Sequence, residues 1–136
     1  MTGSLREVTR STLLAYGDAW RAGDIDRVLA SYADDVIFHY FGGSEVAGTH
    51  VGKEASVAAM MQTASRTSRE LVAIIDVLAG EGLGSIVAVE RFARQDAGIE
   101  PVEVRRVFVY KVATDGRIVE CWVLDEDQTL MDRLWS

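Results

Sequence analysis

Mostly apolar residues recur at spacings of three and four near the start of the chain, which is the period of an amphipathic helix. This stripe predicts a helix over Leu5–Ala22, with one face formed by Leu5, Thr9, Leu13, Tyr16 and Trp20. Gly23 is expected to end the helix, and Asp24 to cap the start of a second one. The second helix is expected to end at Asp34 and Asp35, with an apolar stripe of Ile25, Val28, Leu29 and Tyr32.

The middle of the chain alternates between strand and helix patterns. Val36–Phe41 is β-branched and aromatic, which favours a strand. The next segment favours an irregular loop because it contains Gly42, Gly43 and Gly48. A third helix is predicted over Lys53–Ser65, with an inward face of Val57, Met60, Met61 and Ala64.

From Glu70 onward the apolar period changes to two, which is typical of strands. Four strands are predicted over Leu71–Leu78, Ser85–Arg94, Val102–Val112 and Arg117–Leu124. The Asp115-Gly116 pair favours a tight hairpin turn between the last two. Helices followed by a run of strands indicate the α+β class, with helices packed on one face of an antiparallel sheet.

Composition limits the possible partners and sites. A chain of 136 residues with 49% apolar content suits a single domain, which we expect over residues 1–136. The formal charge of −7 opposes nucleic-acid binding, and the single cysteine, Cys121, excludes an intrachain disulfide. No stretch approaches the roughly 18 apolar residues of a membrane span. The charged N-terminal segment lacks the apolar core of a signal peptide, so we expect a cytoplasmic protein with no membrane partner.

Two stretches frame most of the chain and carry a family resemblance. AYGDAWRAGDIDRVLASYADDVIFHYFGG (Ala15–Gly43) resembles the opening of SnoaL-like and ketosteroid isomerase-like proteins of the nuclear transport factor 2-like superfamily. DGRIVECWVLDEDQTLMDRLWS (Asp115–Ser136) resembles the C-terminal segment of one subgroup. The resemblance implies a cystatin-like cone, in which three N-terminal helices and a curved, mostly antiparallel sheet enclose an apolar pocket. It also implies a homodimer that pairs through the outer face of the sheet.

The resemblance also suggests roles for three positions. Tyr16 stands where the isomerases carry a tyrosine that donates a hydrogen bond to the developing oxyanion, although it could equally be a core tyrosine. Tyr40 stands where they keep an aspartate base, and Arg106 where they keep a protonated aspartic acid. A phenol with a pKa of about 10 is a poor base at neutral pH, so this departure argues against steroid isomerisation.

Arg106 and two further residues could carry charge or protons in the pocket. Arg106 shares an otherwise apolar strand face, where it needs either Glu90 or Asp125 as an ion-pair partner or an anionic ligand group. Asp125 lies on an inward face of the last strand, at the position where the resemblance to SnoaL-like cyclases implies a general base. It is the candidate base, unless it belongs to a solvated acidic run. His39 is an acid/base candidate from the resemblance, although strand alternation places it opposite Tyr40.

The register of the long strand leaves two alternatives open. A shift of one residue would turn Glu103 and Arg105 inward instead of Arg106, a pair resembling the one that positions water in limonene epoxide hydrolase-like proteins. In the register that turns Arg106 inward, the candidate pocket wall consists of Trp20, Phe38, Tyr40, Met60, Phe92, Phe108, Cys121 and Val123. These residues could also be simple core.

These features support one functional hypothesis with two alternatives. The first is an enzyme that needs no cofactor and performs acid/base chemistry, such as isomerisation, cyclisation or dehydration, on a small, apolar, carbonyl-bearing molecule. The alternatives are a non-catalytic module that binds a small molecule or a protein, and an epoxide hydrolase. We expect no metal site, because the two histidines have no carboxylate at ligand spacing.

Overall fold

Within residues 4–136, six strands form one sheet in the order β2-β1-β6-β5-β4-β3. They span β1 (Tyr32–Tyr40), β2 (Gly48–Val51), β3 (Ser68–Ala79), β4 (Leu83–Arg94), β5 (Ile99–Val112) and β6 (Ile118–Asp125). The computed structural model describes residues 4–136. In this range β1 and β6 pair in parallel and the other neighbours pair antiparallel. The predicted α+β class with a mostly antiparallel sheet is therefore confirmed.

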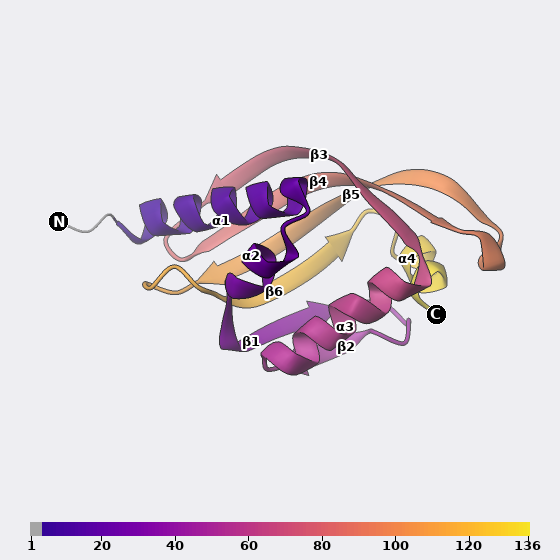
Figure 1. The fold of residues 1–136 in the computed structure, drawn as a ribbon, viewed down its shortest axis with the longest axis horizontal. Helices are drawn as coiled ribbons and strands as arrows, with labels where there is room; N and C mark the ends of the chain where they lie inside the picture. Colours follow the sequence, from indigo (N-terminus) through magenta and orange to yellow (C-terminus); the bar gives the residue numbers. More distant parts are fainter. Residues whose placement is uncertain (1–3) are drawn as a thin grey trace.

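The helices pack near the two edges of the sheet. Figure 1 shows α1 (Leu5–Ala22) alongside β3 and β4, and α3 (Lys53–Arg66) across β1. The short α2 (Ile25–Ala30) follows α1, and α4 (Gln128–Trp135) lies near the end of α3. No helix among residues 4–136 combines the length and the apolar content needed to cross a membrane.

The first helix forms as its sequence predicts. Gly23 ends it in the left-handed conformation, with φ of 67°, which costs glycine little because it has no Cβ. Asp24 then accepts a hydrogen bond from the Arg27 backbone N–H at 3.2 Å and so caps α2. The buried side of α1 includes Leu13 and Tyr16, which confirms the predicted apolar face.

The predicted end of the second helix is wrong. The helix stops at Ala30, and Tyr32 opens β1 instead of completing the helical stripe. The reason is strand pairing, because Tyr32 pairs with Ile118 and the Ser31 carbonyl accepts a hydrogen bond from the Ile118 N–H at 2.9 Å. The first strand therefore begins four positions before the predicted Val36, and a register shift follows between Tyr32 and Ile37.

Two further predictions in this region need correction. Gly48–Val51, expected as loop, forms the edge strand β2 because His50 and Thr49 pair with Phe38 and His39. In α3, Met61 is 43% exposed, so the predicted inward face is rotated. The buried residues of α3 are Ser56, Ala59, Met60 and Thr63.

Pairing of β5 with β4 and β6 settles the register of the long strand. Arg106 lies opposite Asp125 and is 2% exposed, whereas Arg105 points outward and bonds Glu126. Glu103 also lies on the outer face, where it pairs with Arg91 at 3.0 Å. The alternative register with Glu103 and Arg105 inward is therefore wrong, and with it the water-positioning pair expected of an epoxide hydrolase.

The β1–β2 loop is hydrogen-bonded to α4 on either side of Gly42, which provides a stability test. The Gly43 N–H donates to Asp132 Oδ2 and Gln128 Nε2 donates to the Phe41 carbonyl, both at 3.0 Å. Gly42 has φ of 92°, and a Cβ there would collide with the side chains of Asp132 and Gln128. We expect Gly42→Ala to lower the free energy of unfolding by about 1–3 kcal/mol, because a positive φ strains any residue with a side chain. Urea denaturation monitored by circular dichroism would measure the loss.

Gly43 offers a matched control for this test. Its backbone is not in the left-handed region, and a Cβ there would lie 3.7 Å from Asp132 Oδ2, an ordinary contact. Gly43→Ala should therefore cost clearly less than Gly42→Ala. Equal losses for the two variants would contradict the strain argument.

Candidate active-site cavity

A cavity of about 260 Å³ lies between the concave face of the sheet and the first three helices. Its wall contains most of the predicted lining residues: Trp20, Phe38, Tyr40, Met60, Phe108, Cys121 and Val123. Phe92 is the exception, since it is fully buried beneath the Arg106 guanidinium and does not line the cavity. Exposed Ile25 and the half-buried Trp20 and Arg69 mark where the cavity reaches the surface.

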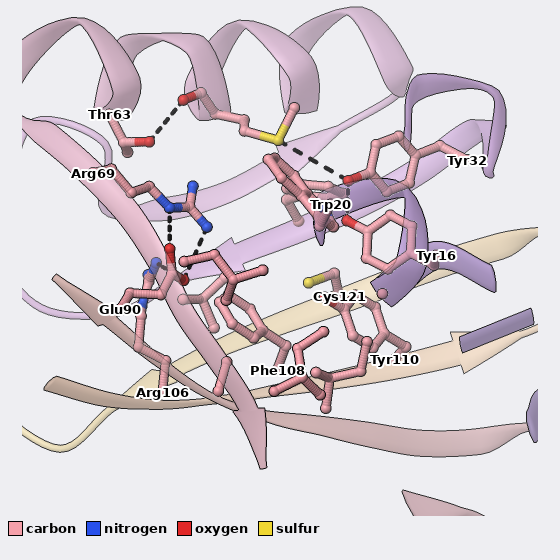
Figure 2. Close-up of a pocket in the computed structure, with 18 of the residues that line it drawn as sticks. Tyr16, Trp20, Tyr32, Thr63, Arg69, Glu90, Arg106, Phe108, Tyr110 and Cys121 are labelled. Carbon is pink, nitrogen blue, oxygen red and sulfur yellow. Dashed lines mark hydrogen bonds and ion pairs between the residues drawn. The ribbon is translucent and has the colours of Figure 1, made fainter. Parts of the chain in front are cut away.

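Three tyrosines gather at one end of the cavity, and we call them the phenol cluster: Tyr16, Tyr32 and Tyr110. The Tyr16 and Tyr32 hydroxyls share a hydrogen bond. The Tyr16 and Tyr110 rings meet edge to face with centroids 5.3 Å apart. Figure 2 shows these side chains coming from α1, β1 and β5, next to the Cys121 thiol.

The phenol cluster is a set of protonated hydrogen-bond donors. Burial raises the pKa of Tyr16 to about 12, and it raises the pKa values of Tyr32 and Tyr110 well above 10. Burial likewise raises the pKa of the Cys121 thiol to about 12, so this cysteine stays unreactive at neutral pH. A protonated phenol in an apolar cavity can stabilise negative charge that develops on a bound carbonyl oxygen.

At the other end, four neighbouring strands each contribute one inward charged side chain. We call this set the charged row, and its members in sheet order are Asp125 (β6), Arg106 (β5), Glu90 (β4) and Arg69 (β3). Arg106 Nε donates to Asp125 Oδ1 at 2.5 Å and Arg106 Nη1 to Glu90 Oε1 at 3.2 Å. Arg69 Nη2 donates to Glu90 Oε1 at 2.9 Å, and Arg69 Nε donates to Glu90 Oε2. The predicted ion pairing of Arg106 with Glu90 and Asp125 is thus confirmed.

The charged row holds Glu90 ionised. Burial acts to raise the pKa of Glu90, but the charges and hydrogen bonds of Arg69 and Arg106 outweigh it and hold the pKa below its usual range. Aromatic rings surround the Arg106 guanidinium, whose Cζ lies 4.9 Å from the Phe108 ring centroid and 5.2 Å from that of Trp135. The two ion pairs and the surrounding rings therefore hold the Arg106 guanidinium in place at the cavity wall.

Two predicted catalytic residues lie outside the cavity wall. The side chain of Asp125 is 1% exposed, and it pairs with Arg106 on the neighbouring strand without lining the cavity. His39 lies on the opposite face of β1 from Tyr40, where its Nε2 is 2.6 Å from Glu120 Oε2 and its ring stacks on Trp122. Of the predicted catalytic set, Tyr16 and Arg106 are the members that line the cavity.

Sequence reasoning missed Tyr32 and Arg69, which the structure places at opposite ends of the cavity. Arg69 lies two residues before Leu71, so extending the strand alternation toward the N-terminus would have placed both on one face. Tyr32 gave no such signal, because the register shift after it breaks the alternation of β1. Among residues 4–136, no three histidine, cysteine or acidic side chains gather in a group that could hold a metal ion.

Comparisons with known proteins identify the domain type. The model of the SnoaL-like domain family matches residues 13–121 of the chain. A Xanthomonas campestris protein of unknown function with a cystatin-like fold has a similar structure, with a TM-score of 0.82 and 24% identity over 94% of this chain and 98% of that one. No curated protein sequence matched the chain.

Two other solved structures share the fold. An NTF2-like protein from Burkholderia xenovorans has a TM-score of 0.78 and 18% identity, over 98% of this chain and all of that one (100%). A candidate polyketide cyclase from Xanthomonas campestris pv. campestris has a TM-score of 0.76 and 20% identity, over 96% of this chain and 99% of that one. At these identities the likeness concerns the fold, not the reaction.

Proposed function

Because the chain belongs to the SnoaL-like domain family, we propose that its cavity binds a small, largely apolar, carbonyl-bearing molecule and catalyses acid/base chemistry on it. The reaction classes are isomerisation, cyclisation or dehydration, and no resident cofactor takes part. The cyclase description of one structural neighbour agrees with these classes. The cavity volume of about 260 Å³ suits a ligand with one or two rings.

The phenol cluster carries this proposal. The Tyr16 and Tyr32 hydroxyls carry two protons, and one of them is used in the hydrogen bond between these residues. A carbonyl oxygen at this end of the cavity would receive a hydrogen bond from the other hydroxyl, which keeps its proton at neutral pH. Such donors gain strength as negative charge grows on the oxygen, so they stabilise an enolate more than the bound ketone. The apolar wall around them excludes water and increases this difference.

Glu90 is the proton acceptor in the proposal. Among the lining residues of the described chain it carries the only carboxylate, and Arg69 and Arg106 hold it ionised. A carboxylate with a lowered pKa is a weak base, so the chemistry suits carbon acids whose protons are already activated by a carbonyl group. Asp125 acts as a positioning residue that holds Arg106.

A second candidate function is binding without catalysis. The observation that favours it is the pairing of every charged lining side chain, since Glu90 uses both of its oxygens to accept hydrogen bonds from guanidinium groups. A fully paired carboxylate has less capacity to accept a proton. The cavity and the phenol cluster would then serve affinity and ligand orientation alone.

One experiment separates the two candidates. β-Tetralone, a fused bicyclic ketone with acidic α-protons, is mixed with the protein in deuterated buffer and followed by NMR. Faster α-proton exchange than in buffer supports the enzyme, and saturation transfer from protein to ligand without faster exchange supports the binding module. Absence of both signals contradicts both candidates.

A further inference from the structure

The charged end of the cavity has an asymmetry of charge. The lining residues of the described chain carry two guanidinium groups, on Arg69 and Arg106, against one carboxylate, on Glu90, which gives a net charge of +1. Asp125, the fourth member of the charged row, does not line the cavity, but its Oδ1 accepts a hydrogen bond from Arg106 Nε at 2.5 Å and its charge offsets that of Arg106. The row as a whole is therefore neutral, and its most exposed member is the positively charged Arg69, although the protein as a whole carries −7.

The order of the charged row strengthens this asymmetry. Its negative end, Asp125, is 1% exposed, whereas its positive end, Arg69, is 24% exposed. The row thus acts as a dipole with its positive end toward the mouth of the cavity. The negative charges on the protein surface reduce the attraction of an anion to Arg69 only slightly, because physiological salt largely screens exposed charges that lie more than roughly 8 Å away.

Donor atoms remain available on both arginines. Within residues 4–136, Arg69 donates its hydrogen bonds from Nε and Nη2, and Arg106 donates from Nε and Nη1. Arg69 Nη1 and Arg106 Nη2 therefore have no hydrogen bond within this part of the chain. Both oxygens of Glu90 already accept hydrogen bonds from these two arginines, so Glu90 repels an anionic ligand group less than a free carboxylate would.

Arg69 is also held in a fixed orientation. Its guanidinium makes two hydrogen bonds to Glu90, and its Cζ lies 5.2 Å from the centroid of the Trp20 ring. Figure 2 shows Arg69 and Glu90 on the side of the cavity opposite Tyr16 and Tyr32. A guanidinium held this way presents its free donor without a further loss of side-chain entropy on binding.

From this geometry we propose that Arg69 is a specificity-determining residue and that the ligand carries a carboxylate or similar planar anion, which binds Arg69 while its carbonyl oxygen binds the phenol cluster. This inference rests on the proposed function, because it names the chemical group at the end of the same ligand that lies opposite its carbonyl. The ligand class is an aromatic or alicyclic keto acid. Neutral ketones of the same shape bind the cavity more weakly.

The test uses two compounds that differ only in charge. para-Acetylbenzoate and para-acetylbenzamide share the ring and the ketone, and isothermal titration calorimetry gives the affinity of each. We expect the wild-type protein to bind the acid about tenfold more tightly than the amide, because charge-assisted hydrogen bonds to a guanidinium are roughly twice as strong as neutral ones. Arg69→Gln should abolish this preference and leave amide binding nearly unchanged, and Arg69→Lys should restore part of it.

Arg91→Gln is the matched control, because Arg91 lies on the outer face of the next strand and pairs there with Glu70 and Glu103. It should keep the wild-type preference. If Arg69→Gln does not fold, Arg69→Gln combined with Glu90→Gln removes the buried carboxylate as well and should also show no preference for the acid.

The possible outcomes separate this inference from the proposed function. Equal affinities for acid and amide in the wild type, or a preference that survives in Arg69→Gln, would overturn the role of Arg69 while the cavity remains a ketone site. Failure of both compounds to bind would contradict the proposed function, and this inference with it.

Discussion

Replacing Arg106 with methionine is expected to lower the free energy of unfolding by about 3–5 kcal/mol, because it leaves buried carboxylates without their partner. Asp125 would lose the hydrogen bond to its Oδ1, and its Oδ2 already has no partner among residues 4–136. Glu90 would keep Arg69 alone. Methionine retains much of the apolar volume, so the loss reports charge and not a cavity. Urea denaturation measures it.

Arg105 is the matched control for this variant. It is the neighbouring residue on the same strand, its side chain is 69% exposed, and it forms a surface ion pair with Glu126. Arg105→Met should change stability little, because exposed ion pairs contribute little. Adding Asp125→Asn to Arg106→Met should recover part of the loss, since the unpaired carboxylate disappears. If Arg106→Met were as stable as Arg105→Met, the burial argument would be wrong.

Removing the Tyr16 hydroxyl is expected to slow catalysis strongly. We expect Tyr16→Phe to reduce α-proton exchange of β-tetralone by about a hundredfold, the usual loss when one oxyanion-hole donor is removed. The loss of stability should be small, about 1 kcal/mol, because one hydrogen bond to Tyr32 disappears and the ring packing remains. Exchange rates by NMR and urea denaturation give the two quantities.

Tyr40 provides the comparison for this prediction. Its ring also lines the cavity, but it packs against Phe38, His50 and Trp135 instead of the phenol cluster. Tyr40→Phe should therefore reduce exchange much less than Tyr16→Phe. Equal reductions in the two variants would show that the phenol cluster has no special role.

The pH dependence of exchange follows from the same residue. Burial raises the pKa of Tyr16 to about 12, so its proton is retained as the pH rises through 10, the usual pKa of tyrosine. Catalysis should consequently show no loss near pH 10 from ionisation of this donor. A decline centred there that disappears in Tyr16→Phe would indicate a tyrosine that is solvated, not buried.

Much of the fold could be predicted from the sequence because helices and strands have local periods. The stripe from Leu5 to Trp20 and the alternation around Arg106 depend on residues within a few positions of one another. The errors occurred where pairing with a distant segment overrode the local pattern. Tyr32 left the helical stripe because it pairs with Ile118, and Gly48–Val51 became a strand because it pairs with β1.

The candidate site could be predicted only in part for the same reason. An arginine on the apolar face of β5 predicted a buried charge with Glu90 or Asp125 as partner, and both partners are present. The base role assigned to Asp125 rested on the inward face of the last strand, on the resemblance to SnoaL-like cyclases and on the expected desolvation of its carboxylate. None of these reveals that Asp125 is buried in an ion pair with Arg106 and does not line the cavity. The roles of the site residues and the expected homodimer stay predictions.

Local patterns in the chain were enough to predict the α+β class, the resemblance to SnoaL-like proteins and a charged group within an apolar strand face. The three-dimensional packing was needed to show that Arg106 and not Arg105 faces inward, that Tyr32 joins Tyr16, and that Arg69 completes the charged row. Each of these depends on which residues lie opposite one another across strands and helices. That register is set by the packing of the whole sheet, since a slip of one residue would exchange its two faces.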